Sequence, residues 1–238
     1  MTDYGLLVSM IIGFGVPALL ATWWSLSGRD GPVGFLDVAL GPAFAGLAVG
    51  RLSALALDDP SSIGSISDML IIRSGVEFWP GVAAAIGMLM LSSYWGLMPP
   101  FRRVADLAPL AMVGYAGYEA ACVFRDGCFG PHSSFGLRPP GLSTTMLPIG
   151  WLMAAAVAAA AVGVQQLSKR GAWPSVIVLS AVAAVAAVRA VGSIWLPHVG
   201  DGLTRQHITS IGVAVASTLG LGVIVATQQH RFVSRSSV

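Results

Sequence analysis

The sequence predicts an all-helical, polytopic membrane protein with about seven spanning helices, and three observations support this fold class. Of the 238 residues, 55% are hydrophobic and only 10% are charged, whereas an ordinary soluble domain carries roughly 25% charged residues. The apolar residues fall into long blocks, separated by turn residues and charges. A bilayer-spanning helix needs about 20 such residues, and seven blocks nearly fill the chain. Residues 1–238 are therefore predicted to form a single transmembrane domain.

The predicted elements follow the apolar blocks in chain order. The first block begins at Leu6 with no basic segment before it and no small-residue cleavage site after it, so we expect a retained helix and not a signal peptide. The Ala-rich run Ala154–Ala161 gives a slim helix that neighbours can approach closely. The spans are predicted near residues 6–27, 33–56, 79–98, 107–125, 145–166, 174–196 and 208–228.

The distribution of basic residues predicts the orientation, because cytoplasmic connections are enriched in lysine and arginine. Alternate connections collect seven basic residues on one side and four on the other: Arg29, Arg102, Arg103, Lys169, Arg170, Arg231 and Arg235 against Arg73, Arg125, Arg138 and Arg205. We expect a bacterial inner-membrane protein with its C-terminus in the cytoplasm and its N-terminus outside. The long connections 58–78 and 125–144 then face outward, and Ile63–Phe78 forms either an interfacial amphipathic helix or a plain loop.

Four ionisable residues lie within predicted spans: Asp37, Arg51, Glu119 and Arg189. A charge at bilayer depth costs at least ~2.5–3.5 kcal/mol, so each should face the bundle interior or a wet cavity. Asp37 and Arg51 lie toward opposite ends of one helix, from which they can reach the interface. Glu119 and Arg189 lie deeper and form either a structural ion pair or a polar ligand site. We expect the two to meet directly or through one water.

Cysteines and histidines give few chemical signals. Cys122 and Cys128 lie at the outer end of the fourth predicted span, where they form either a disulfide, which the outer compartment permits, or small apolar fillers. The histidines are scattered, and neither a metal-ligand spacing nor a phosphate-loop or hydrolase motif is present. We therefore expect no metal and no cofactor. Without a basic patch interleaved with aromatic residues, nucleic acid is not an expected partner.

Five short segments match the motifs of one known family in the same order. Tyr4–Leu7 is similar to Trp-Tyr-Gly-Leu, and Gly50–Leu52 to Gly-Ala-Arg-Leu-Gly. Gly75–Gly81 fits Gly-Leu-Ser-Phe-His-Gly-Gly without gaps, Tyr118–Gly130 fits Gly-Arg-Ile-Gly-Asn/Cys-Phe-x-x-Gly-x-x-x-Gly, and Gly202–Ser210 fits Gly-Leu-Thr-Met-Gly-Gln-x-x-Ser. The chain thus resembles the prolipoprotein diacylglyceryl transferase family over nearly its whole length. The resemblance implies that family's seven-span fold with an outer N-terminus.

The positions that carry the family's chemistry differ in this chain. Those enzymes transfer a diacylglyceryl group from phosphatidylglycerol to a lipoprotein cysteine thiol, which requires a base and cations that hold the phosphate leaving group. The family's histidine, signature arginine, asparagine and two acidic residues correspond here to Trp79, Glu119, Cys122, Gly127 and Ser193. A further His-Pro-x-Gln-Leu-Tyr-Glu stretch has no counterpart around Ser143–Gly150. The positions that match are Arg51, Gly130 and Arg189.

These differences leave alternative functions open, with membrane phospholipid as the expected ligand of the first two. Because an arginine and a glutamate in one cavity neutralise each other, the chain fits a non-catalytic lipid-binding or structural subunit that packs on other integral membrane proteins. Its candidate lipid-binding residues are Arg51, Arg125, Gly130 and Arg189. The alternative is a phospholipid-dependent transferase with a rearranged site, for which the candidate catalytic residues are Arg189, Glu119, His132 and Asp126. A thiol-redox role for Cys122 and Cys128 is the third hypothesis.

Overall fold

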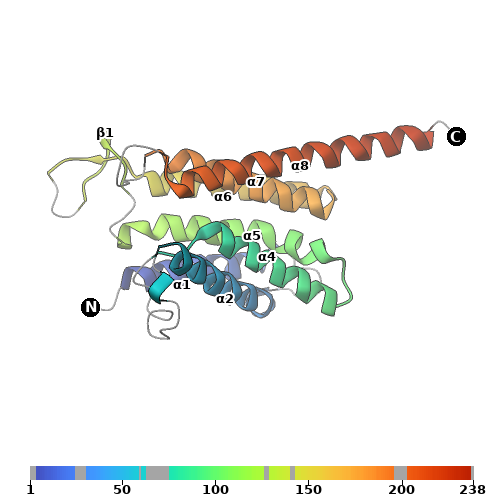
Figure 1. The fold of residues 1–238 in the computed structure, drawn as a ribbon, viewed down its shortest axis with the longest axis horizontal. Helices are drawn as coiled ribbons and strands as arrows, with labels where there is room; N and C mark the ends of the chain where they lie inside the picture. The colour runs from blue at the N-terminus through green and yellow to red at the C-terminus, as the bar shows by residue number, and fades with distance from the viewer. Residues whose placement is uncertain are drawn as a thin grey trace. The chain divides into compact units, whose positions relative to one another are not determined.

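A computed structural model describes residues 4–24, 31–58, 60–62, 75–125, 129–139, 143–195 and 203–236. This part of the chain is almost entirely helical (Figure 1). Its α-helices are α1 (Tyr4–Leu20), α2 (Gly31–Asp58), α4 (Phe78–Trp95), α5 (Pro100–Ala120), α6 (Ile149–Lys169), α7 (Pro174–Gly192) and α8 (Arg205–Ser236). The remaining elements are the short 3-10 helices η1 (Pro60–Ser62) and η2 (Ala121–Arg125) and the strand β1 (His132–Leu137). Each of the seven predicted spans overlaps one of the α-helices.

Five helices in the described residues are long and apolar enough to cross a membrane: α2, α5 together with η2, α6, α7, and α8 as far as Thr227. The other two α-helices, α1 and α4, have 17 and 18 residues and lie at the predicted first and third spans. They fall near the lower end of the ~17–25 residues that a span needs. The protein therefore has the helices of a polytopic membrane protein, five of them of clear spanning length.

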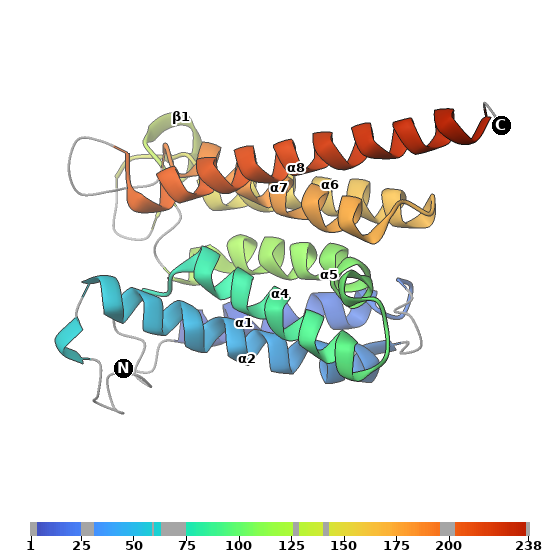
Figure 2. The ribbon, with the colours of Figure 1, turned by 45° about the vertical axis from the view of Figure 1, so that its right-hand side comes forward.

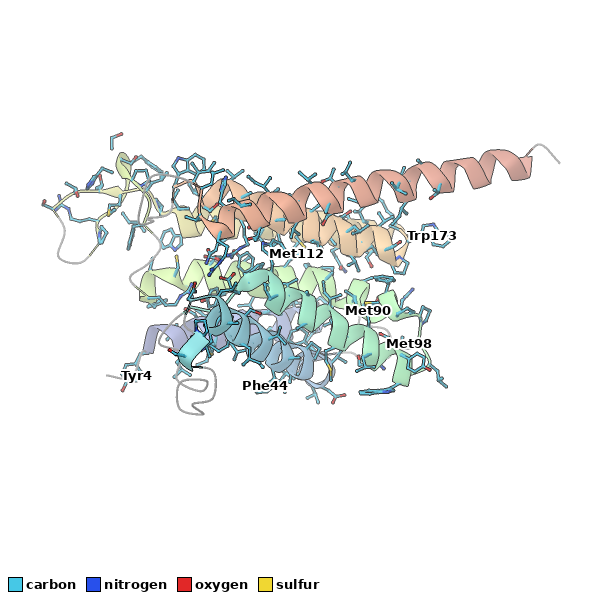
Figure 3. All side chains as sticks on the ribbon, viewed as in Figure 1. Tyr4, Phe44, Met90, Met98, Met112 and Trp173 are labelled. Carbon is cyan, nitrogen blue, oxygen red and sulfur yellow. The ribbon has the colours of Figure 1, made fainter. Side chains whose placement is uncertain are left out.

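The outer surfaces of these helices are apolar, as a hydrocarbon environment requires. Along α8, Ile208, Val215, Leu219 and Val223 are all more than half exposed. Aromatic side chains are exposed instead at helix ends, among them Tyr4 and Trp173 (Figure 3) and the adjacent Tyr94 and Trp95. Tryptophan and tyrosine at helix ends are typical of the two membrane–water interfaces.

The chain divides into two compact units, of which one is Ala21–Leu107. In this unit α2 and α4 lie side by side (Figure 2). Glycines allow the close approach: a Cβ atom on Gly81 would lie 2.8 Å from the carbonyl oxygen of Gly46, and a Cβ atom on Gly50 would lie 2.7 Å from that of Glu77. The spacing Gly46-x-x-x-Gly50 is the sequence signal for such a backbone contact between membrane helices.

The other unit is Met1–Leu20 with Ala108–Val238. Here α7 packs between α6 and α8, and small side chains such as Val157, Ala161 and Ala186 are fully buried. α1 meets the end of α5, where a Cβ atom on Gly114 would lie 2.6 Å from the carbonyl oxygen of Gly13. Beyond η2, β1 forms bridges at both of its ends with Met146, which closes a small hairpin before α6.

Several predicted features lie outside the described residues. They are Asp126, Gly127 and Cys128, most of the segment Ile63–Phe78 with its two alternative structures, and residues 196–202 of the last connection. The predicted single domain and the predicted membrane orientation remain predictions.

Candidate polar site around Arg189

Glu119 and Arg189 form an ion pair between α5 and α7. The Arg189 Nη1 atom lies 3.8 Å from Glu119 Oε1, and the two side chains are only 15% and 16% exposed. Of the two predicted arrangements, a direct ion pair and a bridge by one water, the direct pair is present. Arg189 also lies in the last turn of α7, where the helix dipole favours a cation. Pairing offsets much of the cost of holding either charge away from water.

Tyr115 joins this pair from one turn earlier on α5. The Arg189 Nη1 group donates a hydrogen bond to the Tyr115 hydroxyl at 2.6 Å, and the same hydroxyl interacts with Glu119. Residues four apart share one helix face, so α5 presents the phenol and the carboxylate together. Tyr115 was not among the predicted site residues, although its spacing from Glu119 is a signal that points to it. The charge of Arg189 is thus offset by a carboxylate and a phenol.

A second polar contact lies one turn further along the chain from Arg189. The Ser193 amide donates to the Arg189 carbonyl at 2.9 Å, which ends α7. The Ser193 hydroxyl lies 2.6 Å from Nδ1 of His207, and it also donates to the Ala190 carbonyl at 2.9 Å. His207 is only 7% exposed, and its amide is capped by the Thr204 hydroxyl at the start of α8. Ser193 therefore links α7 to α8 through a buried histidine that the sequence prediction did not single out.

Three side chains satisfy the carbonyls where α5 gives way to η2. Arg125 Nη2 donates to the Tyr118 carbonyl at 2.9 Å, and its guanidinium lies 3.7 Å above the Tyr118 ring. Trp151 Nε1 donates to the Ala120 carbonyl at 3.1 Å, and the Ser9 hydroxyl lies 3.4 Å from the Ala121 carbonyl. The last carbonyls of a helix lack partners within the helix. The predicted lipid-binding residue Arg125 thus acts first as a cap of its own helix.

Gly130 and Cys122 hold structural positions in the same region. A Cβ atom on Gly130 would lie 2.5 Å from Ile149 Cγ1, so close packing against the start of α6 explains the glycine. Its predicted role in lipid binding gains no separate support from this contact. Cys122 is buried in η2 and is disulfide-bonded. Its predicted partner Cys128 lies outside the described residues, so that pairing stays a prediction.

Arg51 is buried in the Ala21–Leu107 unit. The residue is only 5% exposed, and its Nη1 group donates to the Gly75 carbonyl at 3.3 Å. The neighbouring Glu77 is 8% exposed, and its amide donates to the Gly50 carbonyl at 3.0 Å. Trp79, for which the sequence resemblance predicted a histidine position, packs edge-to-face on Phe78 with ring centres 5.0 Å apart. Trp79 therefore supplies an apolar contact at this position, and an indole cannot act as a base.

Of the two remaining candidate catalytic residues, His132 is exposed at the start of β1 and Asp126 lies outside the described residues. His132 lines a surface pocket of about 430 Å³ in the hairpin. In the described ranges, no group of three or more histidine, cysteine, aspartate or glutamate side chains is arranged to hold a metal ion. No family model matches the chain, and no curated protein matches it.

Proposed function

We propose that this chain is a non-catalytic membrane protein of the prolipoprotein diacylglyceryl transferase type, with seven spans and an outer N-terminus in the bacterial inner membrane. In this proposal it binds membrane phospholipid or serves as a structural subunit beside other integral membrane proteins. The observation that supports the proposal is the 3.8 Å pair of Arg189 with Glu119. The resemblance implies a second arginine at the position of Glu119, so a pair of cations is replaced here by a pair with no net charge.

Electrostatics explains why this pairing argues against the transfer reaction. A phosphate about 4 Å from a cation gains roughly 4 kcal/mol at an effective dielectric constant near 20. A carboxylate at similar distance repels the same phosphate by a comparable amount, so the leaving group loses most of its stabilisation. The apolar Trp79 also removes the base that would generate the thiolate.

Features on the helix surfaces support a role in lipid binding or assembly. Gly87, Gly163 and Gly222 each have open space where a Cβ atom would be, on α4, α6 and α8. Small residues on lipid-facing helices permit close packing by lipid chains or by a further helix. α8 also exposes large apolar side chains, among them Leu219 and Val223.

A bacterium depleted of its own diacylglyceryl transferase provides the direct test of this proposal. The chain should fail to rescue a transferase-depleted bacterium, and the purified protein should not convert a lipobox peptide in the presence of phosphatidylglycerol. An active transferase produced at the same membrane level is the control. Robust conversion by the wild-type chain would contradict the non-catalytic function.

One contact favours the alternative, a phospholipid-dependent transferase with a rearranged site. The 2.6 Å contact of Ser193 with His207 Nδ1 brings a hydroxyl and an imidazole together one turn from Arg189, and the imidazole would be the base once the hydroxyl releases the Ala190 carbonyl. Any activity in the same assay should then disappear in Ser193→Ala and His207→Gln, and persist in Thr209→Ala, whose hydroxyl bonds only its own helix.

A further inference from the structure

The hairpin between η2 and α6 contains a polar pocket that is separate from the Arg189 cluster. Its volume is about 430 Å³, which is within the usual size range of small-molecule sites. The described residues that line it carry hydroxyl groups, one imidazole and one guanidinium, and none of these described residues is a carboxylate: His132, Ser133, Ser134, Arg138, Ser143, Thr144 and Thr145. Several hydroxyl donors around one permanent cation suit an anionic ligand.

Internal hydrogen bonds hold the frame of this pocket and leave its donors available. The Ser133 amide donates to the Thr145 carbonyl at 3.1 Å, and the Thr145 hydroxyl donates back to the Ser133 carbonyl. One guanidinium nitrogen of Arg138 donates to the Ser143 carbonyl at 2.8 Å, which places the cation across the hairpin. In the described part of the chain, the hydroxyls of Ser134 and Thr144 make no protein hydrogen bond. They remain free to donate to a ligand.

Two exposed tryptophans near the base of the hairpin favour a position at the level of lipid headgroups. The base is fixed by Gly130, whose amide donates to the Leu147 carbonyl at 2.8 Å; a Cβ atom on Gly130 would lie 3.3 Å from the Trp195 carbonyl oxygen. Trp151 and Trp195 are each 44% exposed at the adjoining ends of α6 and α7. Exposed tryptophans at helix ends mark the membrane–water interface. Phe135, on β1 itself, is 80% exposed and can contact the same layer.

We propose that this hairpin pocket binds the phosphate of an anionic lipid headgroup, with Arg138 as its central ligand and His132, Ser134 and Thr144 as further hydrogen-bond donors. A phosphate offers acceptor oxygens that match an arginine fork together with hydroxyl donors. Free phosphate has the same chemistry, but the exposed tryptophans at this level favour a source in the bilayer. The site lies outside the Arg189 cluster and does not depend on whether the chain has transferase activity.

The test uses the full-length protein in nanodiscs of phosphatidylcholine, with or without phosphatidic acid, whose terminal phosphate is accessible. Lipid bound to the protein is counted by native mass spectrometry after release from the nanodisc. Arg138→Gln should lower the retention of phosphatidic acid roughly tenfold, the loss expected for one charge-assisted contact. Arg170→Gln, which removes another exposed charge, at the turn between α6 and α7, should leave retention unchanged.

Three results would overturn the proposal. Equal retention by Arg138→Gln and the wild-type protein would show that the pocket does not hold the phosphate. An equal loss in Arg170→Gln would show that only overall charge matters. Displacement of phosphatidic acid by inorganic phosphate at comparable concentration would show that the pocket recognises a soluble anion and not a headgroup. Unchanged thermal unfolding of Arg138→Gln confirms that the variant is folded, which is expected because this side chain is exposed.

Discussion

At the scale of single residues, the charge of Arg189 is the feature that bears most directly on chemistry. Arg189, Glu119 and Tyr115 form one hydrogen-bonded and ionic group, in which the arginine has a carboxylate 3.8 Å away and a phenol oxygen 2.6 Å away. Such a group meets the requirement that charges in a membrane bundle be paired. The same pairing removes the free cation that a phosphate would need, so stability and anion binding compete for Arg189.

The first prediction concerns this pair. Glu119→Gln or Arg189→Gln alone should destabilise the protein, because each leaves the partner's charge buried without its counter-charge. Such a loss costs about 3–5 kcal/mol at fully dry sites, and less is expected here because the side chains are slightly exposed. The double variant should recover part of the loss, with a coupling of ~0.5–3 kcal/mol. Thermal unfolding in detergent measures the cycle.

The control for this cycle is the pair of Arg102 with Asp106, 3.5 Å apart on one helix, in which the arginine is 52% exposed and the aspartate 15%. Arg102→Gln should change stability by less than about 1 kcal/mol, because water screens the half-exposed guanidinium. If the losses from Glu119→Gln and Arg189→Gln were strictly additive, the two charges would not interact.

Residues of the site differ in how far the sequence can predict them. The Glu119–Arg189 pair is predictable because two opposite charges in apolar segments have few other partners that would lower the cost of burying them. The contact of Ser193 with His207 is not, since it depends on how the end of α7 meets the start of α8 in three dimensions. Arg125 shows a contact that the sequence did not predict: its guanidinium caps α5 and stacks on Tyr118, and its role in lipid binding stays a prediction.

At the scale of elements, glycine contacts determine which helices lie together. α2 and α4 approach so closely that the carbonyl oxygens of Gly46 and Gly81 each fall within 3 Å of the Cβ position on the other glycine. Membrane helices lack a hydrophobic force that drives them together in lipid, so shape and backbone proximity matter more than side-chain bulk. The periodicity of apolar residues alone does not reveal this pairing.

The second prediction uses two glycines of α4 as a matched pair. Gly81→Ala should force α2 and α4 apart and lower the free energy of unfolding by about 1–3 kcal/mol, the usual cost of overpacking. Gly87→Ala lies on the same helix with nothing within 4 Å of the new methyl group. It should be neutral or stabilising by up to about 1 kcal/mol, because alanine favours the helix. Thermal unfolding of the two variants, side by side, measures the difference; equal effects would contradict the close α2–α4 contact.

The positions of the helices were predictable, whereas their ends were less so. Prolines at 17, 42 and 109 lie inside α1, α2 and α5 without ending them, as apolar blocks in membrane proteins allow. α1 was predicted to continue to residue 27 but its helix ends at Leu20, before the exposed Trp23. The last predicted span ends near residue 228, whereas α8 continues to Ser236. The residues after 228 are mostly polar, so the hydropathy pattern does not include them although they are helical. Hydropathy predicts which part of a helix lies in the hydrocarbon layer, and the helix itself can extend beyond that layer.

At the scale of the whole molecule, basic and aromatic residues occur together at particular turns. Lys169 and Arg170 are exposed next to Trp173 between α6 and α7. Arg102 and Arg103 follow the exposed Trp95 between α4 and α5, and Arg103 Nη1 donates to the Ser92 carbonyl at 2.8 Å. Tryptophan is enriched at both membrane–water interfaces, whereas lysine and arginine are enriched on the cytoplasmic side alone. The four basic residues of these turns belong to the seven that predict a cytoplasmic side, so the orientation stays a prediction from the sequence.

The last prediction tests that orientation with two single cysteines in a background in which Cys122 and Cys128 are replaced by alanine. Leu97→Cys lies at the turn before α5 and Phe135→Cys lies in β1; these side chains are 96% and 80% exposed in the wild-type protein, so neither change disturbs the core. A membrane-impermeant maleimide should label position 135 in intact spheroplasts and position 97 only after the membrane is opened.

α5 with η2, a helical segment of 26 residues, is the only candidate span between the two positions in the described chain, so they must lie on opposite sides if it crosses the membrane. Labelling of both from one side would mean that this segment does not cross. The reverse pattern would keep the fold but place the hairpin pocket in the cytoplasm, because the orientation rests on the seven-to-four bias of basic residues alone.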